Sequence, residues 1–305
     1  MNIACFKRDN ELYDLFLQKG CVVMRITVLI LLLNWSCQKI LQEKPSEQSQ
    51  SLMTGSSQRE KLKENICNQF PQELKPFIED SLKIYLDPKH SEQLVKENMY
   101  NWAIESTVVP DIKGFDKVLD KYPASRYRRN DWTFFYFNRE KAFETADLRV
   151  YLKPKSTQDW NEIASRLFNN VTFMQAFGLG KHISTDLKDK FYYERLDYVC
   201  LSLNTKKTDF LDLVSAIHEA TQGRVVAEDH NLGTDINPGT YMLPVIGDLS
   251  KVSPTDFMLQ TMMTEFKKMA PKRDPCLPHS RQKEIIEAVA KKVFEEHIKL
   301  PICRK

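Results

Sequence analysis

Three charged residues precede an apolar, strand-like segment in the second half of the chain. Glu194, Arg195 and Asp197 stand directly before YVCLSL. A guanidinium at the start of a strand can hold the oxygens of a phosphate or carboxylate through two parallel hydrogen bonds. The same charges also fit an exposed ion pair, which contributes at most about 1 kcal/mol. The residues therefore indicate either a site for an anion or an ordinary charged strand end.

Composition limits the kinds of protein that can carry such a site. The chain has 305 residues, of which 42% are hydrophobic and 28% charged, so it can form one large globular domain or two small ones. The net charge of +3 does not point to a nucleic-acid partner. The basic runs at 126–130 and 267–273 lack interleaved aromatic residues and are typical of solvated surface.

The metal-binding and cofactor motifs that sequences reveal most clearly are absent from this one. None of the seven cysteines forms a Cys-x-x-Cys pair, and their sparse spacing indicates no disulfide framework. Cys200 lies in an apolar strand pattern and is expected to be a small core residue. The acidic cluster around His230 has no diagnostic metal spacing, and no glycine-rich phosphate loop occurs. We therefore expect neither a metal nor a cofactor.

The front of the chain has the features of an export signal. Within 1–41, an arginine at position 25 is followed by the apolar run Ile26 to Leu33 and then by Ser36-Cys37. The run is shorter than the roughly 20 residues that a membrane-spanning helix needs. It resembles a bacterial lipoprotein signal in which Cys37 is lipidated, with Met24 as the start. The alternative is an N-terminal helix that docks its apolar face on the domain.

The rest of the chain divides into three parts. Residues 42–58 are rich in Ser, Gln and Glu and predict a flexible polar tether. Apolar residues at spacings of three and four predict a helical region over 59–130, with Ser91 as an N-cap. Residues 131–305 mix helices and strands and predict an α+β domain with a small, mainly antiparallel or mixed sheet.

The elements of this last part can be placed from their periodicity. Strands are expected at 134–137, 148–152, 198–203 and 240–246. Helices are expected after Ser156 or Thr157, after Thr208-Asp209, and over about 254–269 and 280–298. The segment GLGKHIS, which contains Lys181 and His182, is predicted to be a turn between a helix and the next strand.

The order of several short motifs is informative together. They are FFYF at 134–137, RVY at Arg149 to Tyr151, FGLGK ending at Lys181, RLDYVCLSL with Arg195 and Asp197, and PGTYMLPV at 238–245. This order resembles the HopA family of type III secretion effectors and the related phosphothreonine lyases of class V lanthipeptide biosynthesis, over residues 132–249. The resemblance implies an α+β fold that handles a phosphorylated peptide or protein.

The resemblance also implies roles for individual residues. Phosphate elimination needs a base for the Cα proton, an acid for the leaving oxygen and cations on the phosphate. A lysine can be the base where burial or nearby cations lower its pKa. For the chemistry that the resemblance implies, Lys181 is the best available base, and His182 could supply the acid because histidine titrates near the working pH. Arg149 and Arg195 could bind the phosphate, with Asp197 and Tyr151 in orienting roles.

The sequence departs from the family in ways that leave a second function open. Leu243 stands where the family has a late lysine, and the Phe-Gly and arginine signature that should follow is not evident. Lys181 and His182 are also consistent with a solvated turn. The alternative is a non-enzymatic, lipid-anchored bacterial protein that binds a partner. The expected location is a membrane-anchored lipoprotein in the periplasm or at the cell surface, with a secreted effector or a cytoplasmic protein as alternatives.

Overall fold

The computed structural model describes residues 56–106, 108, 110, 113–142, 144–184, 195–227, 232–245 and 253–304. Residues Gly55–Lys305 form one compact unit. The predicted signal with Cys37, and all but the last residues of the predicted tether, lie outside the described residues, so both stay predictions.

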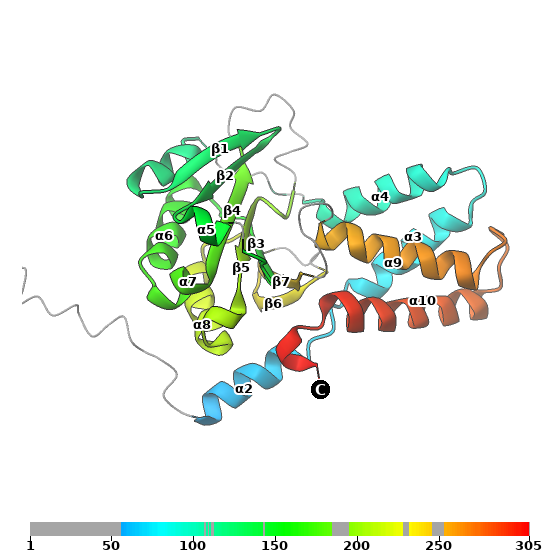
Figure 1. Cartoon of the computed structure of the whole chain (residues 1–305). Helices are drawn as coiled ribbons and strands as arrows, with labels where there is room; N and C mark the ends of the chain where they lie inside the picture. Colours follow the sequence, from blue (N-terminus) through cyan, green and yellow to red (C-terminus); the bar gives the residue numbers. More distant parts are fainter. Residues whose placement is uncertain are drawn as a thin grey trace, which may run out of the picture. The chain divides into compact units, whose positions relative to one another are not determined.

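Helices open and close the described chain (Figure 1). The first three are α2 (Ser56–Cys67), α3 (Leu74–Leu86) and α4 (Glu92–Ile104), and the last two are α9 (Pro254–Met269) and α10 (His279–Val293), which continues as a π-helical turn (Phe294–Ile298). Ser91 caps α4 by accepting a hydrogen bond from the Leu94 amide, as predicted. A final 3₁₀ turn covers Pro301–Cys303.

Between them lies one antiparallel sheet. Its strands are β1 (Ser125–Arg129), β2 (Trp132–Tyr136), β3 (Leu148–Leu152), β4 (Phe177–Ile183), β5 (Val199–Leu203), β6 (Thr234–Asn237) and β7 (Thr240–Pro244). The order across the sheet is β1-β2-β4-β5-β3-β7-β6, and every pairing between these strands is antiparallel. The predicted α+β class is confirmed.

One face of the sheet packs against helices and makes the larger core. The helices are α6 (Thr157–Phe168), α7 (Val171–Ala176) and α8 (Phe210–Thr221), with a 3₁₀ helix at Phe115–Lys121 (Figure 1). Shorter turns lie at Arg139–Ala142 (α5) and Thr205–Lys207 (η4). Phe135, Leu201 and Val150 come from three strands and are fully buried on this face. Ser156 caps α6 and Asp209 caps α8.

The opposite face is only partly covered by the described residues. Helices α3, α4, α9 and α10 build a second core, which takes in Tyr151, Tyr241 and Leu243 from strands β3 and β7. These residues alternate along their strands with residues of the first core, as side chains on a pleated sheet must. Arg149 and Lys181 project from this second face, which we call the cation face.

The segment GLGKHIS is a strand, not a turn. It lies within β4, a central strand between β2 and β5. Gly180 is needed there because an added Cβ would lie 2.1 Å from the ring of Phe135, which occupies the space over the glycine. The basic run at 126–130, predicted to be surface, is exposed and forms most of the edge strand β1.

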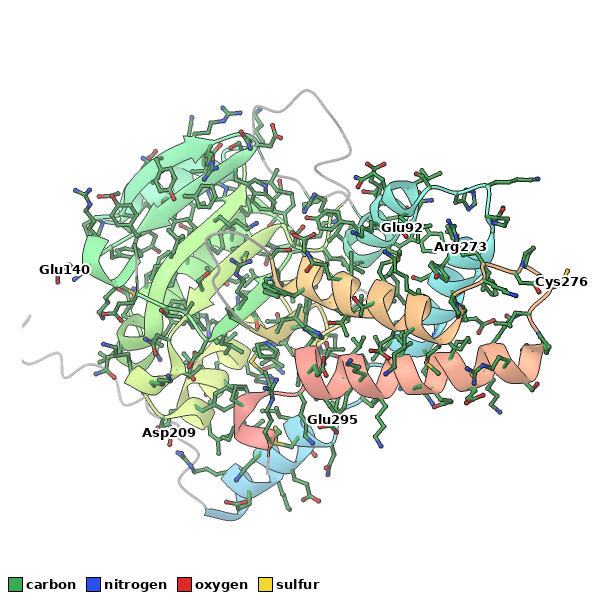
Figure 2. The ribbon with its side chains drawn as sticks, turned by 45° about the vertical axis from the view of Figure 1, so that its right-hand side comes forward. Glu92, Glu140, Asp209, Arg273, Cys276 and Glu295 are labelled. Carbon is green, nitrogen blue, oxygen red and sulfur yellow. A yellow bond between two sulfur atoms is a disulfide. The ribbon has the colours of Figure 1, made fainter. Side chains whose placement is uncertain are left out.

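The expectation of no disulfide is wrong. Cys67 at the end of α2 is bonded to Cys303 in the final 3₁₀ turn, across 236 residues of sequence. Spacing along the chain could not reveal this pair, because the fold brings its two ends together. Cys200 is a free, buried core residue as predicted, and Cys276 is free and exposed on the loop before α10 (Figure 2).

Candidate anion-binding site

The register of the sheet brings three of the predicted site residues, Lys181, Tyr151 and Arg149, onto one face. Lys181 on β4 is directly opposite Cys200 on β5, and Cys200 is opposite Tyr151 on β3. Arg149 lies two residues from Tyr151 and therefore projects from the same face. Strands stand about 4.8 Å apart, so two long cationic side chains from β3 and β4 can reach one another across β5.

Arg149 is a guanidinium without an ion-pair partner among the described residues. Its Nε is buried and unsatisfied, and the Tyr151 hydroxyl lies within hydrogen-bonding reach of the guanidinium. Buried polar atoms are bonded in the great majority of native structures, and each exception calls for an explanation. Tyr151 and Cys200 beside it carry no charge at neutral pH, because burial raises the pKa of both groups. The carboxylate that acts on the Arg149 charge is Asp197, which is itself paired with Arg195.

Lys181 is a second cation without a counter-ion among the described residues. Its Nζ lies 3.7 Å from the centre of the Trp132 ring, and this cation–π contact is its only polar interaction there. Burial lowers the pKa of the Lys181 ammonium. The positive charges of Arg149 and Arg195 lower it further, while Asp197 acts in the opposite direction. Lys181 therefore loses its proton more easily than an exposed lysine, which is the condition under which a lysine can act as a base.

Arg195 joins the site together with its own counter-ion. Its Nε and Nη2 donate to the two carboxylate oxygens of Asp197 at 2.8 and 2.9 Å, and Nη2 also lies 3.4 Å from the Tyr100 hydroxyl. Its Cζ lies 5.4 Å from the centre of the Trp132 ring, so that ring contacts both Arg195 and Lys181. Asp197 orients Arg195, but it also uses two of the guanidinium nitrogens that would otherwise bind a ligand.

The structure does not bring His182 together with Lys181. Neighbouring residues on a strand point to opposite faces, so His182 lies in the larger core, where its ring meets Phe115 at 5.4 Å. Its Nδ1 donates to the Ile183 carbonyl, and its Nε2 lies 3.4 Å from Asp116. Pairing Lys181 with His182 as base and acid rested on taking GLGKHIS for a turn. The strand separates the two side chains.

The burial of His182 predicts a pH dependence of stability. Burial lowers the pKa of His182 below that of an exposed histidine, about 6.5. Between these two pKa values, His182 is protonated in the unfolded chain but not in the folded chain. The free energy of unfolding should therefore fall as the pH drops from about 6.5 toward the lower pKa, by up to about 1.4 kcal/mol per pH unit. Urea denaturation between pH 7.5 and 5 measures this slope.

His182→Gln should flatten that slope, and the exposed His279→Gln serves as its matched control. Part of the slope should remain, because burial also lowers the pKa of His297. An unchanged slope in His182→Gln would contradict the prediction.

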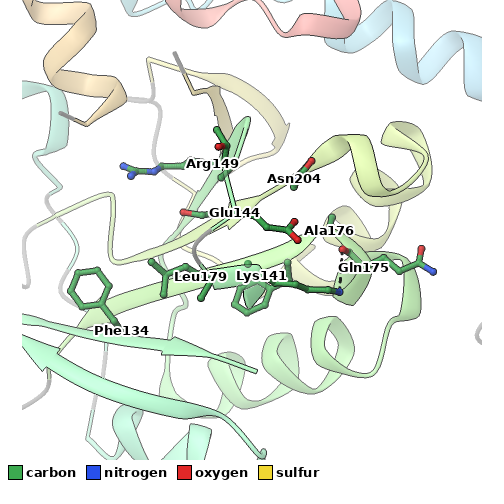
Figure 3. Close-up of a pocket in the computed structure, with 14 residues that line it drawn as sticks. Phe134, Lys141, Glu144, Arg149, Gln175, Ala176, Leu179 and Asn204 are labelled. Carbon is green, nitrogen blue, oxygen red and sulfur yellow. Dashed lines mark hydrogen bonds between the residues drawn. The ribbon is translucent and has the colours of Figure 1, made fainter. Parts of the chain in front are cut away.

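A pocket of about 470 Å³ opens beside Arg149. Its floor includes Leu179, Ser202 and Arg149, which follow one another across β4, β5 and β3. Phe134, directly opposite Lys181, forms part of its wall. Figure 3 shows the Arg149 side chain extending away from Lys141 toward the Phe134 side of the pocket. Arg149 thus belongs both to the pocket and to the group of cations.

Two contributors to the site were missed in the sequence. Trp132 supplies the ring that Lys181 and Arg195 share, and Tyr100 reaches Arg195 from α4. If Lys181 had been predicted on a strand, the alternation of side chains would have placed Trp132 on the same face, because Trp132 lies two residues before Phe134, the partner of Lys181. No local signal marks Tyr100, which meets Arg195 through a contact 95 residues away in sequence.

The described ranges contain no group of three or more His, Cys, Asp or Glu residues that could hold a metal ion. Positions 228–230 of the acidic cluster lie outside these ranges. Among the helices that the structure describes, none is both long and apolar enough to cross a membrane.

Comparison with known proteins gives structural neighbours alone. No family model matches the chain, and no curated protein matches it. The structure of an effector protein from Pseudomonas syringae pv. syringae strain 61 is similar with a TM-score of 0.48 and 10% identity, covering 73% of this chain and 94% of that one. An effector from Pseudomonas syringae pv. tomato strain DC3000 is similar with a TM-score of 0.32 and 14% identity, covering 79% and 89%.

Both neighbours are bacterial effectors, the class of protein that the sequence resemblance names. Because both TM-scores are below 0.5, the likeness carries no inference about the activity or the site residues of this chain.

Proposed function

We propose that this chain binds a phosphorylated peptide or protein on the cation face of its sheet. The observation that supports the proposal most directly is Arg149, a guanidinium on a central strand with a buried, unsatisfied Nε. A phosphate supplies acceptor oxygens in the planar arrangement that a guanidinium fork matches. The central strand fixes the backbone of Arg149, so only the side chain remains for the ligand to order.

The charge balance of the face favours a dianion. Asp197 neutralises Arg195, because the two form a close pair with both carboxylate oxygens engaged. Arg149 and protonated Lys181 carry two positive charges, and neither forms an ion pair with a described residue. A phosphate monoester carries between one and two negative charges at pH 7 and would balance them.

A second candidate function is elimination of the bound phosphate, favoured by the lowered pKa of Lys181. Neutral Lys181 would take the Cα proton of phosphothreonine, and the electron pair of that C–H bond would form a Cα=Cβ double bond. The Cβ–O bond would break and phosphate would leave with its bonding electrons. Arg149 would offset the charge that builds up on the leaving oxygen, so the step needs no acid from His182.

Phosphate release from a phosphothreonine peptide tests this activity, and Lys181→Ala should lower the rate by at least about a hundredfold. The rate should rise with pH and level off below the ordinary lysine pKa, because only the neutral amine accepts a proton. Lys207→Ala, an exposed lysine on the η4 turn, is the matched control. Binding without phosphate release would favour the non-enzymatic alternative, and absence of both would overturn the proposal.

We further propose that the protein works in an oxidising compartment. Disulfides persist outside the cytosol and are rare within it, and the Cys67–Cys303 bond closes the described fold. The proposal agrees with the expected export signal ending at Cys37. Mass spectrometry of the protein from its native membrane fraction should find an acylated Cys37 as the first residue. An intact Met1 would remove the lipid anchor and the membrane as a partner.

A further inference from the structure

We infer that the pocket beside Arg149 is a specificity subsite for an apolar side chain of the phosphorylated peptide, two residues away from the phosphorylated one. This inference rests on the proposed phosphate binding. At about 470 Å³ the pocket has the size of a small-molecule site, far more than one phosphate group fills. The pocket therefore has room for a further part of the ligand.

The register places the floor of the pocket at a defined distance from Lys181. The floor residues Leu179 and Arg149 lie two positions along their strands from Lys181 and Tyr151, which is about 7 Å. An extended peptide advances about 3.4 Å per residue and points alternate side chains the same way. A side chain two residues from the phosphorylated one therefore reaches the pocket when the phosphate lies over Lys181, within reach of the long Arg149 side chain.

The larger part of the pocket's lining is apolar, which favours an apolar side chain. Phe134, Ala142, Ala146, Phe177 and Leu179 contribute the apolar surface, whereas Glu144, Gln175, Ser202 and Asn204 contribute polar groups. The ammonium of Lys141 is turned away, because it donates to the carbonyls of Met174 and Gln175 at the end of α7 (Figure 3). Arg149 then lies between the apolar part of the pocket and the phosphate.

The test compares peptides and a filled pocket. Seven-residue phosphothreonine peptides with leucine two positions before or after the phosphothreonine are compared with a peptide that has glycine at both positions. Calorimetry of the full chain should find one leucine peptide bound about tenfold more tightly than the glycine peptide. Ala142→Phe fills the pocket and should abolish this preference without changing the affinity for the glycine peptide.

Glu140→Phe, on the same helical turn but exposed and outside the pocket, is the matched control and should retain the preference. Equal affinities for all three peptides would overturn the subsite while leaving phosphate binding intact. Loss of all phosphopeptide binding by the unaltered chain would overturn the proposed function instead. If circular dichroism shows that Ala142→Phe is not folded, the affinities of the three peptides for the unaltered chain still decide whether the subsite exists.

Discussion

Arg149→Met is expected to weaken phosphopeptide binding by at least about thirtyfold while leaving the protein as stable as before or more so. Removing one partner from a desolvated charge pair costs about 2 kcal/mol or more, which sets the loss of affinity. The free energy of unfolding should not fall, because Arg149 has no ion-pair partner among the described residues and its Nε is unsatisfied. Methionine fills a similar space and removes a buried, unsatisfied Nε.

Calorimetry with a phosphothreonine peptide and urea denaturation measure the two effects on the same protein. The control is Arg126→Met, an arginine on β1 whose position pairs with Phe135 of the opposite face and which forms an ion pair with Asp120. Arg126→Met should bind the phosphothreonine peptide with the same affinity as the unaltered chain. A strongly destabilised Arg149→Met would mean that the guanidinium holds the fold together, and that result would count against a ligand site.

Replacing both Cys67 and Cys303 by serine is expected to lower the free energy of unfolding by about 3–5 kcal/mol. The bond removes conformational freedom from the unfolded chain, and the effect grows with the 236-residue separation. For a chain of this size the midpoint of thermal unfolding should fall by roughly 10 °C. Differential scanning calorimetry under non-reducing conditions measures the shift.

Two comparisons isolate the bond itself. Cys276→Ser, which removes an exposed free thiol, should leave the midpoint unchanged. Addition of reductant should bring the unaltered chain down to the midpoint of the double variant. A double variant that melts with the unaltered protein would show that α2 is held without the bond, through the ion pairs of Arg59 with Asp209 and Asp212.

Long, periodic segments of the fold were predictable from the sequence. The helix predicted at about 254–269 is α9, Pro254–Met269, with Ser253 and Asp256 forming a capping box. The strand predicted at 148–152 has those same bounds. Local hydrogen bonding and apolar periodicity determine both elements, so a single sequence contains the information.

Elements that depend on distant partners were not predictable. Strand β4 contains two glycines and a lysine and has no strand pattern of its own. It exists because Phe135 packs over Gly180 and because β2 and β5 supply hydrogen bonds on both sides. The same holds for the Cys67–Cys303 bond, whose partners are close only in the folded chain.

The candidate site was predictable in its residues but not in its arrangement. Arg149 and Lys181 lie on one face of the sheet, and Arg195 shares the Trp132 ring with Lys181, while the roles that the resemblance implied for them stay predictions. That Asp197 neutralises Arg195, leaving Lys181 and Arg149 without counter-ions, follows from contacts that no spacing reveals. The exclusion of His182 follows from strand alternation alone, once β4 is known to be a strand.

The edge strand β1 has a consequence for the solubility of the protein. Its outer side has no partner strand in the described structure, and all five of its residues are exposed. An unpaired edge invites pairing with other molecules, and charged side chains are one means by which natural sheets prevent it. Arg126, Arg128 and Arg129 put three like charges along this edge, so two copies that approached strand to strand would repel one another.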